Sequence, residues 1–203
     1  MRLCLAAACL LAVAGPGRAD CRGDLVEALD RSFTAGPFHA ERVARRSLAG
    51  TDASSSHFDI KVVPPNDAES VITGDHAPIG TRTVGGKVWF LEEAGWRVNS
   101  VAIAKGWYDS IVGDASKVGS FSLKDRVPSQ VECLGSARVE GADYLAYRYF
   151  DADAELGTRI NAYLDPKTHL LARLDTSMWG LMWAETLRMT YDPTLTLPTD
   201  PAP

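Results

Sequence analysis

Four segments in the last third of the chain alternate polar and apolar residues, and they read as consecutive strands. They are Tyr144–Phe150, Thr158–Leu164, Leu170–Thr176 and Glu185–Tyr191. A period of two residues is typical of a β-strand with one face toward a core and the other toward water. The turn Asp165-Pro166-Lys167-Thr168 joins two of these segments. The pattern therefore predicts an antiparallel sheet.

The first half of the chain predicts one helix followed by further short strands. From Asp24 to Phe33 the apolar residues fall on one helical face, and Gly36-Pro37 is a stop signal. His57–Val63 predicts a strand that ends at Pro64-Pro65. The strands expected next are Glu69–Thr73, Arg82–Leu91 and Trp96–Val98, with turns at Gly85-Gly86 and Glu92–Gly95.

The middle of the chain returns to helical spacing. Apolar residues from Ile103 to Val118 predict one or two short amphipathic helices lying across the sheet, interrupted by Gly106 and Gly113. Glycine weakens an isolated helix, so packing must hold these helices, and a helix held by packing can lift. The polar segment Thr51–Ser56 predicts no regular structure.

The N-terminus has the features of a secretory signal peptide. Met1-Arg2 is a short positive region, Leu3–Gly15 is apolar, and Gly17-Arg18-Ala19 resembles a cleavage site. We expect residues 1–19 to be removed, which leaves one domain over 20–192 and a proline-rich C-terminal tail over 193–203. The apolar run is shorter than the roughly 20 residues that span a membrane, so we expect a soluble periplasmic protein.

Removal of the signal peptide would leave two cysteines, Cys21 and Cys133. An even number of cysteines in an exported chain predicts a disulfide, which would tie the N-terminus to the start of the C-terminal half. The alternative, a redox or metal pair, lacks a CxxC spacing and a nearby histidine. The net charge of −5 argues against nucleic acid or anionic lipid headgroups as the main partner.

The order of short motifs resembles a known group of envelope proteins. The motifs are Ala35-Gly36-Pro37-Phe38, Val62-Val63-Pro64-Pro65, Gly85–Trp89 with Gly95-Trp96, Cys133-Leu134-Gly135, Val139-Glu140-Gly141 with Tyr147, Tyr163–Leu171, and Tyr191-Asp192 with Pro198. In this arrangement the chain is similar to exported proteins of the LolA/LolB-like group, which includes periplasmic lipoprotein carriers and lipid-binding domains. It has His169 where that group more often has glycine.

The resemblance implies an α+β fold. A strongly curved antiparallel β-sheet would form an incomplete β-barrel, with an N-terminal helix and short helices covering its mouth and an apolar cavity that accepts acyl chains. It also implies that an arginine on a strand helps to hold the closed state. The candidates, among which the sequence leaves the choice open, are Arg82, Arg97, Arg148, Arg159 and Arg173.

An apolar segment between two of the predicted strands suggests where such a ligand would bind. Acyl chains bind through buried area, at about 25 cal/mol per Å², and methionine adapts to varied shapes. The segment Met178–Trp183 is more apolar than an ordinary connection. The predicted lining or lid residues are Trp107, Ile111, Met178, Trp179, Leu181, Met182 and Trp183. The alternative is that they complete an ordinary core.

Patterns for catalysis or metal binding are sparse. His39, His57, His76 and His169 lie in separate segments without HExxH spacing, and Asp151-x-Asp153-x-Glu155 lacks the rest of a calcium loop. We therefore expect no catalytic residues, no metal site and no cofactor, although a site assembled from distant residues leaves no local spacing.

Two functions from different classes remain. The first is a carrier or binding protein for a lipid, a lipid-modified protein or another apolar ligand, with the middle helix and Met178–Trp183 as a movable cover. The second is a non-catalytic envelope interaction or sensing module whose cavity is filled by its own side chains. A hydrolase is the least favoured alternative. We expect a monomer that binds an apolar ligand or acyl chain and an envelope protein, with no nucleic acid and no stable membrane insertion.

Overall fold

A computed structural model describes residues 20–48, 51–75, 77–99, 103–118, 121–122, 127–151, 157–178 and 183–199. The helices are α1 (Cys21–Ser32) and α2 (Ala104–Ala115). The strands are β1 (Phe38–Leu48), β2 (Thr51–Val63), β3 (Asp67–Thr73), β4 (Ile79–Val84), β5 (Lys87–Glu92), β6 (Gly95–Asn99), β7 (Lys117–Val118), β8 (Phe121–Ser122), β9 (Glu132–Val139), β10 (Ala142–Asp151), β11 (Thr158–Leu164), β12 (Leu171–Met178) and β13 (Trp183–Tyr191). No helix among these residues is long and apolar enough to cross a membrane.

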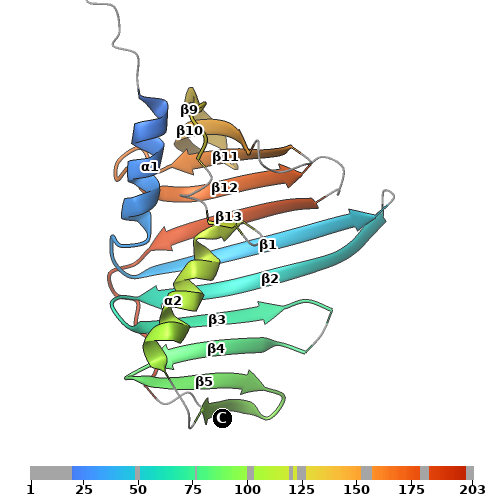
Figure 1. Ribbon diagram of the computed structural model, residues 1–203, viewed down its shortest axis with the longest axis vertical. Helices are drawn as coiled ribbons and strands as arrows, with labels where there is room; N and C mark the ends of the chain where they lie inside the picture. Colours follow the sequence, from blue (N-terminus) through green and yellow to red (C-terminus); the bar gives the residue numbers. More distant parts are fainter. Residues whose placement is uncertain are drawn as a thin grey trace, which may run out of the picture.

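One 11-stranded antiparallel sheet dominates the molecule, with the order β6-β5-β4-β3-β2-β1-β13-β12-β11-β10-β9. Neighbours in this order are also neighbours in sequence, except where β1 pairs with β13 and joins the two meanders (Figure 1). The sheet stays open, because β6 and β9 form its edges. The predicted α+β fold, a curved half-barrel with an N-terminal helix and a further helix, is confirmed.

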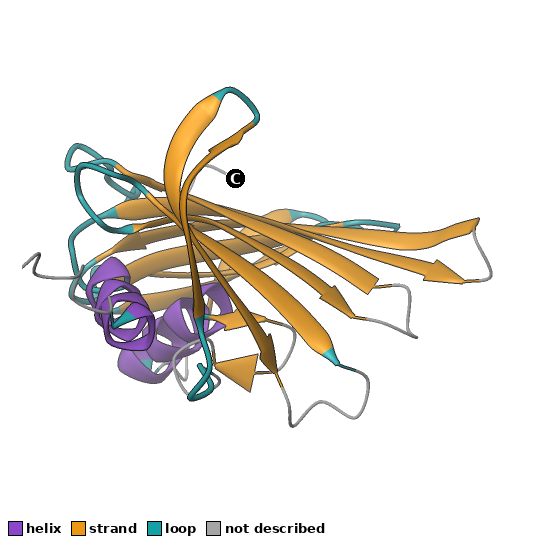
Figure 2. Cartoon of the chain, turned by 90° about the horizontal axis from the view of Figure 1, so that it is seen from above, coloured by secondary structure: helices purple, strands orange, loops and turns teal. Residues whose placement is uncertain are grey.

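Both helices lie on the same side of the sheet (Figure 2). Helix α1 contacts β9 and β12, whereas α2 crosses β2 to β5. In α1, Leu25, Ala28, Leu29 and Ser32 are buried, which is the spacing of one helical face. Ser32 also ties this helix to the sheet, since its Oγ accepts a hydrogen bond of 2.7 Å from the backbone N–H of Leu171.

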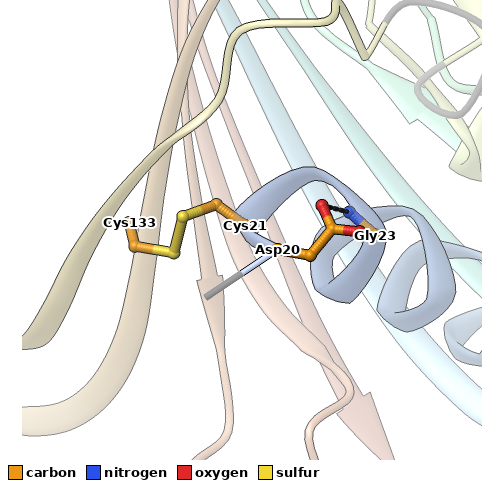
Figure 3. Close-up of a disulfide and its surroundings, with 4 residues drawn as sticks. All are labelled: Asp20, Cys21, Gly23 and Cys133. Atoms are coloured by element: carbon orange, nitrogen blue, oxygen red, sulfur yellow. Dashed lines mark hydrogen bonds between the residues drawn. A yellow bond between two sulfur atoms is a disulfide. The ribbon is translucent and has the colours of Figure 1, made fainter. Parts of the chain in front are cut away.

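A disulfide fixes the start of α1 to the edge of the sheet. Cys21 and Cys133 are bonded, with their Cα atoms 5.4 Å apart (Figure 3). Asp20 caps the same helix, because its Oδ1 accepts a 2.9 Å hydrogen bond from the N–H of Gly23. The disulfide predicted from the sequence is present.

The β9–β10 hairpin turns away from the helices, onto the other side of the sheet (Figure 2). Its turn residue Glu140 accepts from Arg188 at 3.0 Å and forms an ion pair with Arg173 at 2.8 Å. The hydrogen bond from Arg173, which is the largest cause, and the hydrogen bond from Arg188 lower the pKa of the exposed Glu140 carboxyl. The hairpin is thus bonded to β12 and β13, and this edge of the sheet is strongly bent.

Two expectations about local structure were wrong. Thr51–Ser56 is the start of β2 rather than an irregular segment, because it pairs with the end of β1 across a register shift at Arg46/Ser47. Met178 and Trp183 are not part of a connection, since they are directly opposite each other in β12 and β13. The four β-strand segments predicted in the last third correspond to β10, β11, β12 and β13.

Candidate ligand-binding site

A cleft of about 350 Å³ lies between α2 and the strands beneath it. It is lined by Ser70, Ile72, Ile79, Gly80, Thr81, Phe90, Leu91, Trp107, Ser110, Ile111 and Asp114. The strand residues come from β3, β4 and β5, and the remainder come from α2. The volume lies in the range of small-molecule sites, which starts at about 300 Å³.

The secondary structure places the lining residues on facing surfaces. Trp107, Ser110, Ile111 and Asp114 follow the spacing i, i+3, i+4, i+7, so they form one stripe of α2. On the sheet, Thr81 is paired with both Ser70 and Phe90, so these three side chains point to the same face. Helical and strand periodicity together therefore build the walls.

An aromatic pair joins α2 to β5 across the cleft. The rings of Phe90 and Trp107 meet edge to face, with centroids 5.1 Å apart and an interplanar angle of 82°. Ile111 is 2% exposed and anchors the helix, whereas Trp107 is 36% exposed and Ile79 is 59% exposed. Large apolar side chains thus remain accessible where the cleft opens.

A buried arginine connects α2 to the sheet. Arg42 of β1 is 7% exposed, and its Nη1 donates a 2.9 Å hydrogen bond to the carbonyl oxygen of Asp114. Its guanidinium lies 3.8 Å from the centroid of the Phe58 ring, and its Nε is 3.7 Å from Oε1 of Glu185. Arg42 therefore holds the C-terminal turn of the helix against β1.

The arginines selected from the sequence have other partners. Arg82 pairs with Glu69, Arg97 with Glu92, Arg148 with Glu132 and Asn161, and Arg173 with Asp175 and Glu140; Arg159 lies on β11. The resemblance implied a strand arginine that holds a closed state, and among the described residues Arg42 has the contact that suits such a role. The sequence feature that could have identified Arg42 is its position along the strand. Phe38, Ala40 and Arg42 are two residues apart, so they point to the same buried face.

The structure brings together two of the predicted ligand-binding residues. Trp107 and Ile111 both line the cleft beneath α2. Met178 and Trp183 are not among the residues that line this cleft, and they pair with each other at the ends of β12 and β13. Trp183 packs against the hydrophobic core and is partly buried. Trp179, Leu181 and Met182 lie outside the described residues.

The sequence analysis did not select the strand side of the cleft. Ile72, Ile79, Phe90 and Leu91 are ordinary strand residues, and their role depends on which strands α2 crosses. Burial does not alternate cleanly along β3 or β5, so a period of two residues does not identify the face that lies beneath the helix.

A second cleft, of about 330 Å³, lies against α1, but its lining is more strongly charged. It includes Asp24, Glu27, Arg31 and His169 beside Ala28, Leu145, Tyr147 and Leu164. Leu25 and Leu29 of the helix are at most 1% exposed and belong to the same core as Leu164, Leu171 and Leu174. Charged groups are costly to bury against an apolar ligand. The cleft beneath α2 is therefore the better candidate for a ligand site.

The fold and its cleft define a class of protein: an open, strongly curved antiparallel half-barrel with two helices on one side. No protein-family model matches the sequence, and a search of curated proteins found no match. Among solved structures, the Mycobacterium tuberculosis lipoprotein LppX aligns with a TM-score of 0.51 and 15% identity, over 86% of this chain and 95% of LppX.

Two further solved structures are similar in arrangement. LprF from Mycobacterium bovis aligns with a TM-score of 0.51 and 10% identity, over 89% of this chain and 98% of LprF. A LolA superfamily protein from Nitrosomonas europaea is more distant, with a TM-score of 0.34 and 9% identity over 88% and 95% of the two chains. The likeness to LppX and LprF shows the fold, and the predicted LolA-like arrangement is confirmed at that level.

Proposed function

We propose that the protein is an exported, non-catalytic binding or carrier protein that holds an apolar molecule, such as an acyl chain of a lipid or lipid-modified protein, beneath α2. The observation that carries the proposal is the cleft of about 350 Å³ between the helix and β3 to β5. The fold shared with LppX and LprF and the signal peptide predicted over residues 1–19 are consistent with it.

The walls of the cleft suit a chain-like apolar ligand. Ile72 and Ile111 contribute aliphatic surface, and the Phe90–Trp107 pair contributes aromatic surface at one end. Burial of apolar area stabilises such a complex without needing a specific motif, at about 25 cal/mol per Å². Because α2 forms one wall, movement of α2 would admit and release the ligand, and an envelope protein would then receive it.

The test is uptake of the fluorescent probe N-phenyl-1-naphthylamine by the protein and by a variant with a filled cleft. Ser110 lines the cleft and is otherwise exposed, so Ser110→Trp adds an indole there without removing a buried group. We expect probe fluorescence to rise when the unchanged protein is added. The affinity for the probe should be at least tenfold lower in Ser110→Trp.

Asp109→Trp is the matched control, because Asp109 is an exposed residue of the same helix outside the cleft. It should bind the probe as the unchanged protein does. Failure of the unchanged protein to bind the probe would contradict the proposal and favour the interaction module with a filled cavity. Equal binding by the unchanged protein and Ser110→Trp would place the site elsewhere.

A further inference from the structure

The cleft beneath α2 has a polar part as well as an apolar one. Ser70, Thr81, Ser110 and Asp114, which have hydroxyl or carboxylate side chains, are among the residues that line it. Among the described residues that line it, Asp114 is the one with a titratable side chain. Trp107 and Asp114 lie two turns apart on α2, so the aromatic pair and the carboxylate mark different ends of one wall.

Two cations near the helix have partners other than the Asp114 carboxylate: Arg42 lies beside its C-terminal end, and Lys105 lies at its N-terminal end. Arg42 bonds the backbone carbonyl of Asp114, and its charge faces Glu185 at 3.7 Å. Lys105 of the same helix pairs with Asp109 at 3.0 Å. Within the described part of the chain, no ion pair neutralises the Asp114 carboxylate, although Arg42 lies nearby.

These observations determine which polar group suits the cleft. A carboxylate or phosphate beside Asp114 would place two negative charges together in a partly buried site, which is unfavourable. A hydroxyl can donate a hydrogen bond to the Asp114 carboxylate, and an ammonium adds charge attraction. Serine and threonine hydroxyls can satisfy the remaining polar atoms of either group.

We propose that the cleft selects single-chain amphiphiles whose head group donates hydrogen bonds and carries no negative charge, such as fatty alcohols, monoacylglycerols or alkylamines, and that Asp114 sets this selectivity. This inference rests on the proposed binding function. It excludes fatty acids and anionic phospholipids as preferred ligands of the cleft.

The test is competition against N-phenyl-1-naphthylamine at pH 7 by decylamine, decanol and decanoate. These three compounds have alkyl chains of similar length and differ in the charge of the head group. The unchanged protein should bind decylamine and decanol at least tenfold more tightly than decanoate. In Asp114→Asn the difference between decylamine and decanoate should shrink to about threefold or less. Asp114 lies in the last turn of α2, where a negative charge opposes the helix dipole, so this variant should be no less stable.

Asp109→Asn is the matched control, since it removes the same charge from the exposed side of the same helix. It should keep the full discrimination, which separates a local effect of Asp114 from the acidic charge of the whole chain. Tight decanoate binding by the unchanged protein, or unchanged discrimination in Asp114→Asn, would overturn the inference while leaving apolar binding intact. Failure of all probes to bind would overturn the proposed function itself.

Discussion

At the scale of single residues, burial changes the acid–base chemistry of Tyr191 at the end of β13. Its hydroxyl donates a 3.2 Å hydrogen bond to the carbonyl of Leu171, and its ring lies 6.1 Å from that of Phe38. Burial raises the pKa of Tyr191 to about 12, opposed by a hydrogen bond with Ser32. The side chain thus joins β13 to β12 as a neutral phenol.

Stability should therefore fall in alkali. Because the pKa of Tyr191 is about 12 when folded and about 10 when unfolded, its contribution is complete below pH 10 and is lost as pH rises through 12. The loss should reach about 2 to 3 kcal/mol. Urea unfolding of the unchanged protein and Tyr191→Phe should show Tyr191→Phe less stable by about 1 kcal/mol at pH 7 and no longer less stable near pH 12. A constant difference at all pH values would contradict this.

At the scale of secondary-structure elements, the two helices are held very differently. Helix α1 has the Asp20 cap, the Ser32 hydrogen bond and the Cys21–Cys133 disulfide, which closes 112 positions and contributes about 4 to 5 kcal/mol in chain-entropy terms. Helix α2 has no side-chain N-cap and depends on packing and on Arg42. We therefore expect opening to occur at α2.

Replacing Arg42 should loosen α2 selectively. Arg42→Met removes the hydrogen bond to Asp114 and the contact with Glu185, which should lower the free energy of unfolding by about 3 kcal/mol. In hydrogen-exchange measurements, amides of α2 should exchange at least about tenfold faster while those of α1 change less. Arg45→Met, at an exposed position of the same strand, is the control. Equal acceleration in both helices would show that Arg42 does not tether α2 in particular.

The sequence predicted the helices and strands better than it predicted how they pair and pack with one another. Alternation and turn residues located the strands from β10 to β13, and periodicity located both helices. Thr51–Ser56 was missed because its polar residues carry no burial signal, and its strand depends on the backbone of β1 as a partner.

The ligand site was predicted in part, for a related reason. Trp107 and Ile111 could be selected because helical periodicity gives α2 an apolar face. Phe90, Ile72 and Arg42 were missed because their roles follow from where α2 crosses the sheet, which depends on contacts far apart in sequence. Met178 and Trp183 were selected because the segment that they bound is apolar. In the structure they are opposite each other in two paired strands.

At the scale of the whole molecule, the two helices cover different parts of the curved sheet. Side chains of both helices belong to one hydrophobic core, and α2 also forms a wall of the apolar cleft over β3 to β5. The disulfide holds the start of α1 at the β9 edge of the sheet. One helix held by a disulfide and hydrogen bonds, and a second held mainly by packing, is an arrangement that suits a binding or carrier protein with a movable cover.

The central claim is that the cleft beneath α2 holds an apolar ligand in the cell. The most direct measurement is organic extraction and mass spectrometry of the protein purified from the cells that produce it, alongside Ser110→Trp purified in the same way. The account predicts an acyl-containing species at about one molecule per protein, largely lost in Ser110→Trp and retained in Asp109→Trp. The absence of any apolar species from the unchanged protein, or equal amounts with both the unchanged protein and Ser110→Trp, would contradict the account.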